Sequence, residues 1–228
     1  GEIDKIVEKG LYKDAKSLVG LIASPRGADM FDSKTNMVSE YRSGGPQMAA
    51  VASCPLSDVD NYVWGVNSGP DTKFGDVISA ASCTTNASAS LAKAICDFVR
   101  QTPGAAVTKL SGLTVHAVTN SDVAAGSKHD KNKTAIQGGI ADTGAAKAML
   151  KLGLPIKKID MECRRELAPN GSSLELEFVI QGLDTKLGTE ALRKGFMDYI
   201  QRRSTDPSDV MSRILAVDEH ATSSKSFI

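Results

Sequence analysis

A cysteine in a polar run is the residue best placed to do chemistry in this chain. Cys83 lies within residues 79–86, whose sequence is Ser-Ala-Ala-Ser-Cys-Thr-Thr-Asn. Thr84, Thr85 and Asn86 are residue types that cap a helix start, because their side-chain oxygens accept free backbone N–H groups. The partial positive charge at a helix N-terminus favours a thiolate, which is the nucleophilic form of cysteine. Cys83 is therefore a candidate nucleophile; the alternative is a buried cysteine that acts as a small hydrophobic residue.

Two regular elements are needed to position this chemistry. After the cysteine, apolar residues recur at the i, i+4, i+7, i+8 spacing of an amphipathic helix, at Leu91, Ile95, Phe98 and Val99. Before the next break, residues 110–118 are predicted to form a strand, and His116 lies near its end. The sequence therefore predicts a strand-borne histidine and a helix-borne cysteine.

The composition excludes several classes of function. The chain has 228 residues, of which 41% are hydrophobic and 24% charged, and its formal net charge is zero, so neither nucleic acid nor an anionic membrane is indicated as a partner. No apolar run approaches the ~18 residues of a membrane span, and the acidic start predicts no leader peptide. The four cysteines form no CxxC pair and no cluster with histidine, so we expect neither a zinc site nor a disulfide framework. An intracellular, reducing compartment fits best, with cytoplasm and organelle both open.

The remaining patterns predict the order of elements along the chain. We expect a helix over 2–16, a strand over 18–23, a mostly irregular polar stretch over 27–61 that packs on another chain, and a strand over 62–66. Two later strands, 159–167 and 174–180, flank Asn170-Gly171, a strong hairpin signal. Further helices are predicted to start near Asn86, Thr143 and Thr185, and a short one at Asp206-Pro207.

Several short motifs resemble one known family. The Ser-Cys-Thr-Thr-Asn run of 82–86 and the Thr-Val-His-Ala-Val-Thr run of 114–119 are similar to the signatures of phosphorylating glyceraldehyde-3-phosphate dehydrogenases. Further matches at 64–67 and 143–148 keep the family's order, weaker ones run over 18–25 and 214–228, and the resemblance covers some 200 positions. It implies an α+β fold with a mixed, largely antiparallel sheet and helices packed on it, like the catalytic domain of that family.

The resemblance also implies roles for individual residues. Cys83 would add to an aldehyde to give a thiohemiacetal and then carry an acyl thioester, and His116 would act as general base and stabilise the oxyanion. The matches to the family's two phosphate sites are Ser82, Thr84, Thr143 and Gly144 for inorganic phosphate, and Thr119 and Arg164 for the substrate phosphate. Hydroxyls and N–H groups at helix starts suit a phosphate, although simple helix capping would explain the same hydroxyls.

Departures from the family bear on the cofactor. The sequence contains no GxGxxG turn of the kind that cradles a dinucleotide, and the family's C-terminal segment is not matched. The family's phosphate-binding loop arginine has no counterpart near 133–135. We therefore interpret 1–78 as the end of a cofactor domain with an insertion at 27–61, and 79–228 as a C-terminally truncated catalytic-type domain. NAD binding is expected only if a complete cofactor site is supplied from elsewhere.

Three hypotheses follow for the function. The first choice is a divergent, non-catalytic structural subunit of a larger assembly with protein partners, in which 27–61 makes contacts. The alternative is NAD-dependent oxidation of glyceraldehyde 3-phosphate, if the chain is a fragment or another chain supplies the cofactor domain. The third is thiol chemistry at Cys83 without NAD, such as acyl transfer or redox sensing.

Overall fold

The computed structural model describes residues 18–22, 48–53, 55, 59–75, 77–117, 141–142, 144–166, 172–183 and 188–215. The chain divides into two compact units. The first comprises residues 1–62 and 72–81, and the second comprises 63–71 and 82–228. The predicted helix over 2–16 lies outside the described residues. Whether 1–78 is the remnant of a cofactor domain and 79–228 a truncated domain stays a prediction.

The first unit contains a parallel sheet of three short strands. β1 (Leu18–Ile22), β2 (Met48–Ala52) and β3 (Val77–Ser79) are ordered β1-β2-β3. The prediction of a strand at 18–23 is thus confirmed. The prediction that 27–61 is irregular and packs away from its own domain is wrong for 48–52, because β2 is the central strand and pairs on both sides. Its run of small apolar residues suits a strand with a neighbour on each edge.

The expected strand over 62–66 is wrong. These residues turn instead, because Gly65 adopts a φ of +75° and the Asn67 side chain accepts a hydrogen bond from the Val63 N–H at 2.8 Å. A side chain at Gly65 would come within 2.7 Å of Ile214 Cδ1, so both backbone and space require glycine here. The apolar run predicted a strand, but the asparagine and glycine close it into a turn.

The second unit is an α+β domain built on a mixed sheet of four strands. β4 (Ala106–Ala117), β5 (Ala141–Asp142), β6 (Lys158–Glu166) and β7 (Ser172–Gln181) are ordered β5-β6-β4-β7. β4 runs parallel to β6 and antiparallel to β7, and β5 runs antiparallel to β6. Two of these three pairings are antiparallel, so the predicted fold class is confirmed.

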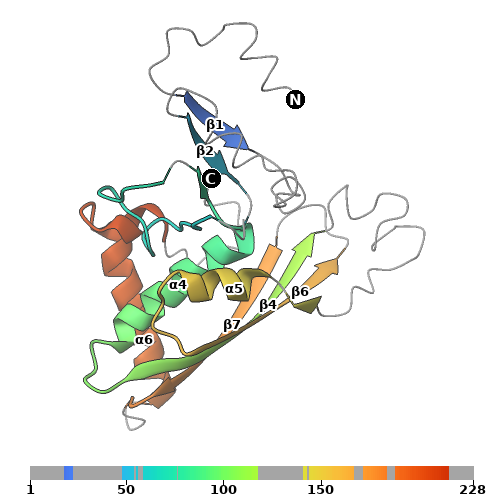
Figure 1. The fold of residues 1–228 in the computed structure, drawn as a ribbon. Helices are drawn as coiled ribbons and strands as arrows, with labels where there is room; N and C mark the ends of the chain where they lie inside the picture. The colour runs from blue at the N-terminus through green and yellow to red at the C-terminus, as the bar shows by residue number, and fades with distance from the viewer. Residues whose placement is uncertain are drawn as a thin grey trace, which may run out of the picture. The chain divides into compact units, whose positions relative to one another are not determined.

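The predicted hairpin at Asn170-Gly171 is wrong. β6 and β7 are antiparallel to each other, but β4 lies between them and pairs with both (Figure 1). Adjacent strands are about 4.8 Å apart, so β6 and β7 lie roughly 10 Å apart in the sheet, which is too far for one tight turn to join them. A local turn signal predicted the reversal of direction correctly. It could not predict that an earlier strand occupies the place between the two.

Helices cover one face of this sheet. α4 (Cys83–Val99) packs against β4 and β7, and α5 (Gly144–Lys151) packs against β6 (Figure 1). α6 (Gly188–Thr205) packs against α4 and is followed by a short 3₁₀ helix, η3 (Val210–Arg213). The three helices begin within three residues of the predicted starts. The last short helix was predicted from Asp206-Pro207, but it begins after an Asp209 cap.

Alternation along the strands defines two faces. We call the face toward α4 and α5 the covered face; it carries the buried residues Leu110, Thr114, Ile159 and Met161. We call the other the open face; its side chains are exposed or half-buried and include those of Ser111, Leu113, Val115, Asp160, Glu162, Arg164, Glu175, Glu177 and Val179. On the covered face, a side chain at Gly112 would meet those of Met161 and Leu176 at 2.6 and 2.7 Å, so side chains from the two flanking strands cover β4 at this glycine.

Candidate active site

The start of α4 is capped by a residue different from those predicted. Ser82 is the N-cap, with extended backbone (φ −104°, ψ 163°), and its Oγ accepts the Thr85 N–H at 3.0 Å. Asn86 also contributes, because its Nδ2 donates to the Ser82 carbonyl at 2.9 Å. Cys83 is therefore the first residue of the helix rather than the residue before it. Serine is among the residue types most favoured at the N-cap position, and the sequence offers four capping residues between positions 82 and 86.

Ala81, which lies two residues before α4, has a backbone conformation that is unusual for alanine. Ala81 has a φ of +59°, which costs an alanine roughly 1–2 kcal/mol relative to ordinary conformations. Its N–H donates to Ser79 Oγ at 3.0 Å, and Ser79 Oγ in turn donates to Asn61 Oδ1 at 2.7 Å. No feature of the sequence singles out Ala81, because glycine is the residue expected at positive φ.

Cys83 and His116 meet as the sequence predicts. The Cys83 Sγ lies 3.4 Å from the His116 Nε2, within reach of a sulfur hydrogen bond. Cys83 is exposed, so a reactant can approach the thiol, and the first turn of α4 contains no acidic side chain to offset its positive end. The predicted geometry is confirmed. The catalytic roles of the two residues stay predictions.

His116 is held by a strand that is paired with a neighbour on each edge. It is the second-last residue of β4, aligned with Arg165 on β6 and with Ser172 on β7. Two residues earlier on the same face, Thr114 is buried and donates from Oγ1 to the Ser173 carbonyl at 3.4 Å. Because β4 is paired along both edges, its end is anchored, and the histidine ring starts from a fixed backbone position.

The predicted phosphate-site residues are only partly brought together. Ser82 and Thr84 flank Cys83 at the start of α4, and Gly144 is the first residue of α5. Thr119 and Thr143 lie outside the described residues. Free N–H groups at the start of α4, together with these hydroxyls, are able to bind an anion, and capping already uses the Ser82 hydroxyl.

Arg164 does not share the sheet face of the cysteine and histidine. It aligns with Val115 on the parallel neighbour β4, whereas His116 aligns with Arg165. Laterally aligned residues of a sheet point to the same face and successive residues to opposite faces, so Arg164 belongs to the open face and His116 to the covered face. Sequence similarity placed an arginine near the site. The register places it on the other side of the sheet.

The other described cysteines differ from Cys83. Cys96, on the same helix, is buried, and the loss of solvent raises the pKa of its thiol to about 11. Cys163 is half-buried on β6, and Cys54 lies outside the described residues. Within the described ranges no three side chains form a metal-binding group, and no described helix is long and apolar enough to cross a membrane.

A second cluster, which sequence patterns did not predict, fastens α4 to α6. Arg203 donates to both carboxylate oxygens of Asp209 at 2.6 and 3.0 Å, to Asp97 at 3.0 Å, and to the Tyr199 hydroxyl at 2.9 Å. Lys93 also pairs with Asp97 on α4. The arginine holds the pKa of Asp209 below its usual value. Charges 106 positions apart leave no local signal, so only the fold could show this cluster.

Comparison with known proteins places these features in a family context. The chain is 28% identical to glyceraldehyde-3-phosphate dehydrogenase of Aspergillus niger over 214 residues, which is 85% of this chain and 57% of the relative. It is 34% identical to glyceraldehyde-3-phosphate dehydrogenase 1 of Globodera rostochiensis over 185 residues, or 74% of this chain and 55% of the relative. The chain is related to the glyceraldehyde-3-phosphate dehydrogenase family. A shorter match, 38% identical over 125 residues, is to the enzyme of Neurospora crassa.

The relationship to glyceraldehyde-3-phosphate dehydrogenases agrees with the α+β fold, but the chain matches only part of each relative. In these three matches the chain spans between 34% and 57% of the relative's length. No protein-family model matches the chain. The family relationship is therefore shown by individual relatives, whereas activity, substrate and partners need an argument from the site itself.

Proposed function

We propose that this protein is a glyceraldehyde-3-phosphate dehydrogenase-like domain that forms a covalent adduct with a phosphorylated aldehyde at Cys83. The observation that carries the proposal is the 3.4 Å contact between Cys83 Sγ and His116 Nε2 at the start of α4. A thiol nucleophile requires a base within hydrogen-bonding reach and access for the electrophile, and this pair has both.

The chemistry follows from the positions of these atoms. His116 Nε2 takes the thiol proton while Cys83 Sγ bonds to the aldehyde carbon, and the carbonyl π electrons move to the oxygen. The resulting oxyanion takes a proton back from the histidine, which gives a thiohemiacetal. This addition conserves oxidation state and needs no redox cofactor. The N–H groups at the helix start would bind the phosphate, or stabilise the oxyanion.

Oxidation of that adduct would require a nicotinamide as hydride acceptor. A dinucleotide needs a glycine-rich turn whose backbone approaches the pyrophosphate. Within the described residues, no strand leads through such a turn into a helix; the residues before α4 are Ala80, Ala81 and Ser82. The described residues do not fit the cofactor, so we assign no hydride-transfer step to them. We propose that NAD acts here only where another polypeptide segment completes its site.

A structural role is the second candidate function. The observation that favours it is the position of Arg164, because the register takes this side chain away from the face that bears His116. The arginine that matches the family's substrate-phosphate site then lies on the face opposite His116, whereas the residue that aligns with His116 is Arg165. A non-catalytic subunit that keeps the fold would tolerate that arrangement. It would not need the cysteine–histidine contact, which is why we place this function second.

Protection from alkylation separates the two functions. Glyceraldehyde 3-phosphate should slow the reaction of Cys83 with iodoacetamide at least tenfold, as measured by peptide mass spectrometry, because the adduct blocks the sulfur. Glycerol 3-phosphate, which lacks the aldehyde, is the matched control and should protect much less. Equal protection by both compounds would show phosphate binding without covalent chemistry. No protection by either, with alkylation as slow as for an unfolded thiol, would favour the structural role.

A further inference from the structure

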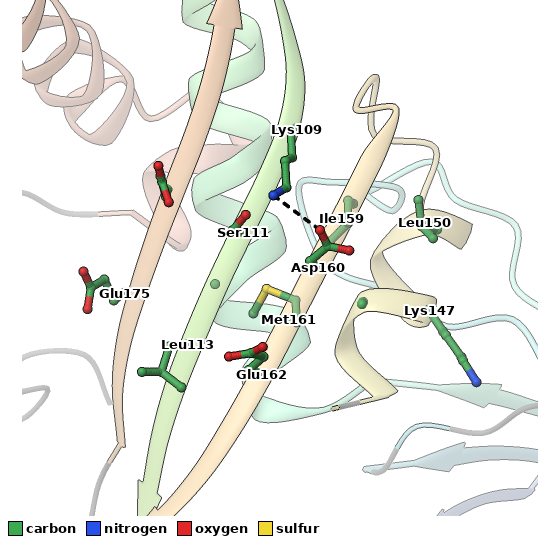
Figure 2. A pocket seen from close by; sticks show the side chains of 13 residues that line it. Lys109, Ser111, Leu113, Lys147, Leu150, Ile159, Asp160, Met161, Glu162 and Glu175 are labelled. Carbon is green, nitrogen blue, oxygen red and sulfur yellow. Dashed lines mark ion pairs between the residues drawn. The ribbon is translucent and has the colours of Figure 1, made fainter. Parts of the chain in front are cut away.

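The cavity shown in Figure 2 does not supply residues to the reactive thiol. It has a volume of about 720 Å³ and is lined by residues of β4, β6, β7 and α5, among them Lys109, which pairs with Asp160 at 3.5 Å. Neither Cys83 nor His116 is among the described residues that line it. The position of the thiol depends instead on the segment that leads into α4.

The backbone just before α4 is anchored by several hydrogen bonds. Ser79, the last residue of β3, donates its N–H to the Asp60 carbonyl at 3.0 Å, and its own carbonyl accepts the Tyr62 N–H at 2.8 Å. Ala80 donates its N–H to the Ala52 carbonyl at 2.7 Å. Two consecutive residues are therefore held to two other segments of the chain.

Ala81 joins this anchored strand end to the cap of α4. On its other side, Ser82 is held by its own bond to the first turn of the helix. With one residue between two fixed positions, the φ of Ala81 is imposed by its surroundings, and its value is +59°. Glycine adopts such a φ without strain, whereas alanine does so only where the structure requires it, and such conformations are found preferentially at functional sites.

A buried hydroxyl supports this conformation. Ser79 Oγ accepts the Ala81 N–H at 3.0 Å and donates its proton to Asn61 Oδ1 at 2.7 Å. Because the hydroxyl donates in one direction and accepts in the other, its orientation is fixed. Ser79 and Ala81 are 0 and 1% exposed, so water does not replace the bond between them.

The reactive thiol lies two residues beyond this network. We propose that Ser79 and Asn61 are positioning residues for Cys83, and that they act through the backbone of Ala81. A change of φ at Ala81 would displace the first turn of α4, and a shift of roughly 1 Å would break the 3.4 Å contact between Cys83 Sγ and His116 Nε2. This inference rests on the proposed role of Cys83 as a nucleophile.

Alkylation rates of the full chain test the proposal. Ser79→Ala removes the acceptor of the Ala81 N–H and should slow the reaction of Cys83 with iodoacetamide about tenfold at pH 7, because the thiol loses its base; peptide mass spectrometry measures the rate. Ser88→Ala is the matched control, since Ser88 is also fully buried and its hydroxyl has no hydrogen-bond partner among the described residues. The control should react at the native rate. Equal slowing in both variants, or none in Ser79→Ala, would overturn the proposal.

A second substitution separates positioning from support of the fold. In the double variant S79A/A81G, glycine accepts the positive φ without strain, so alkylation of Cys83 should return to within about twofold of the native rate. The free energy of unfolding in urea should not recover, because glycine loses more freedom on folding and the buried N–H stays unpaired. Alkylation as slow as in Ser79→Ala, or reactivity that follows stability in both variants, would contradict the proposal.

Asn61→Ala is a milder test that holds if Ser79→Ala does not fold. It keeps the hydroxyl but removes its acceptor, and it should slow alkylation of Cys83 about threefold; an unchanged rate would count against the proposal. Alkylation needs neither aldehyde nor phosphate. A failure of glyceraldehyde 3-phosphate to protect Cys83 would therefore contradict the proposed function and leave these differences between variants unchanged.

Discussion

The two cysteines of α4 lie near opposite ends of the helix and differ in their exposure to solvent. Cys83 begins the helix, is exposed, and lies 3.4 Å from a histidine nitrogen. Cys96 lies thirteen positions later, is 2% exposed, and has a pKa of about 11 because burial disfavours its thiolate. The first end is open to chemistry, and the second is packed and fastened to α6 through Arg203. The difference teaches that reactivity on this helix comes from surroundings rather than from residue type.

The largest expected effect is a difference in alkylation between these two cysteines. With a pKa of about 11, only ~1 in 10⁴ of the Cys96 thiols would be ionised at pH 7, and the buried sulfur also excludes the reagent. We therefore expect native Cys96 to react with iodoacetamide at least ~100-fold more slowly than Cys83, as measured by peptide mass spectrometry. In denaturant the two rates should converge. Similar rates in the native protein would show that the second end of the helix opens readily.

A loss of stability should follow from removing Arg203, which links α4 to α6 at the packed end. Arg203→Met leaves the carboxylates of Asp97 and Asp209 without this partner, and both are mostly shielded from water. We expect the free energy of unfolding in urea to fall by about 2–3 kcal/mol. Arg193→Met on the same helix is the matched control, because its exposed pair with Glu190 contributes little. If both variants lose the same stability, the interactions of Arg203 contribute no more to folding than an exposed ion pair does.

A smaller effect is expected from the base at the reactive end. His116→Gln removes the ring nitrogen beside Cys83 Sγ and should slow alkylation of that cysteine about tenfold at pH 7. The midpoint of urea unfolding should change little, because His116 lies near the end of β4 and is only half-buried. Unchanged alkylation with unchanged stability would show that the contact is not a functional one.

The smallest effect is a dependence of stability on alkaline pH. The folded pKa of Cys96 exceeds that of an exposed thiol, about 9, so between these two values the folded state holds a proton that the unfolded state has lost. Stability contributed by the neutral thiol is full below pH 9 and decreases as pH rises toward 11. We expect a fall of about 1 kcal/mol between pH 8 and pH 10 that Cys96→Ala removes, as measured by urea unfolding. A fall of the same size in the alanine variant would assign the effect to another group.

Local features of this protein could be predicted from its sequence, and pairings between distant segments could not. The spacing of Leu91, Ile95 and Phe98 predicted α4, and the Thr-Val-His run predicted β4, because side-chain periodicity is a property of each segment alone. The contact of Cys83 with His116 came from a family resemblance rather than from physical derivation. The predicted caps lie two to four residues after the actual Ser82 cap, since four of the five residues at 82–86 are types that suit a helix start.

Errors concentrated where a second segment decides the outcome. Asn170-Gly171 indicated a hairpin, yet the place beside β6 is taken by β4. Met48–Ala52 was too short and weak a signal, until pairing with both β1 and β3 stabilised it as a strand. The faces of the sheet depend on register, because a shift of one residue would move Arg164 to the side of His116.

The position of β4 between two strands that follow it in the chain has a consequence for synthesis on the ribosome. When residues up to 157 have emerged, β4 is complete, but neither β6 nor β7 exists to pair with it. Its twelve residues then present two open edges, and such edges recruit strands from other molecules. The nascent chain is therefore most prone to aggregate in the interval before its last third is made, and a chaperone that shields an extended strand would act there.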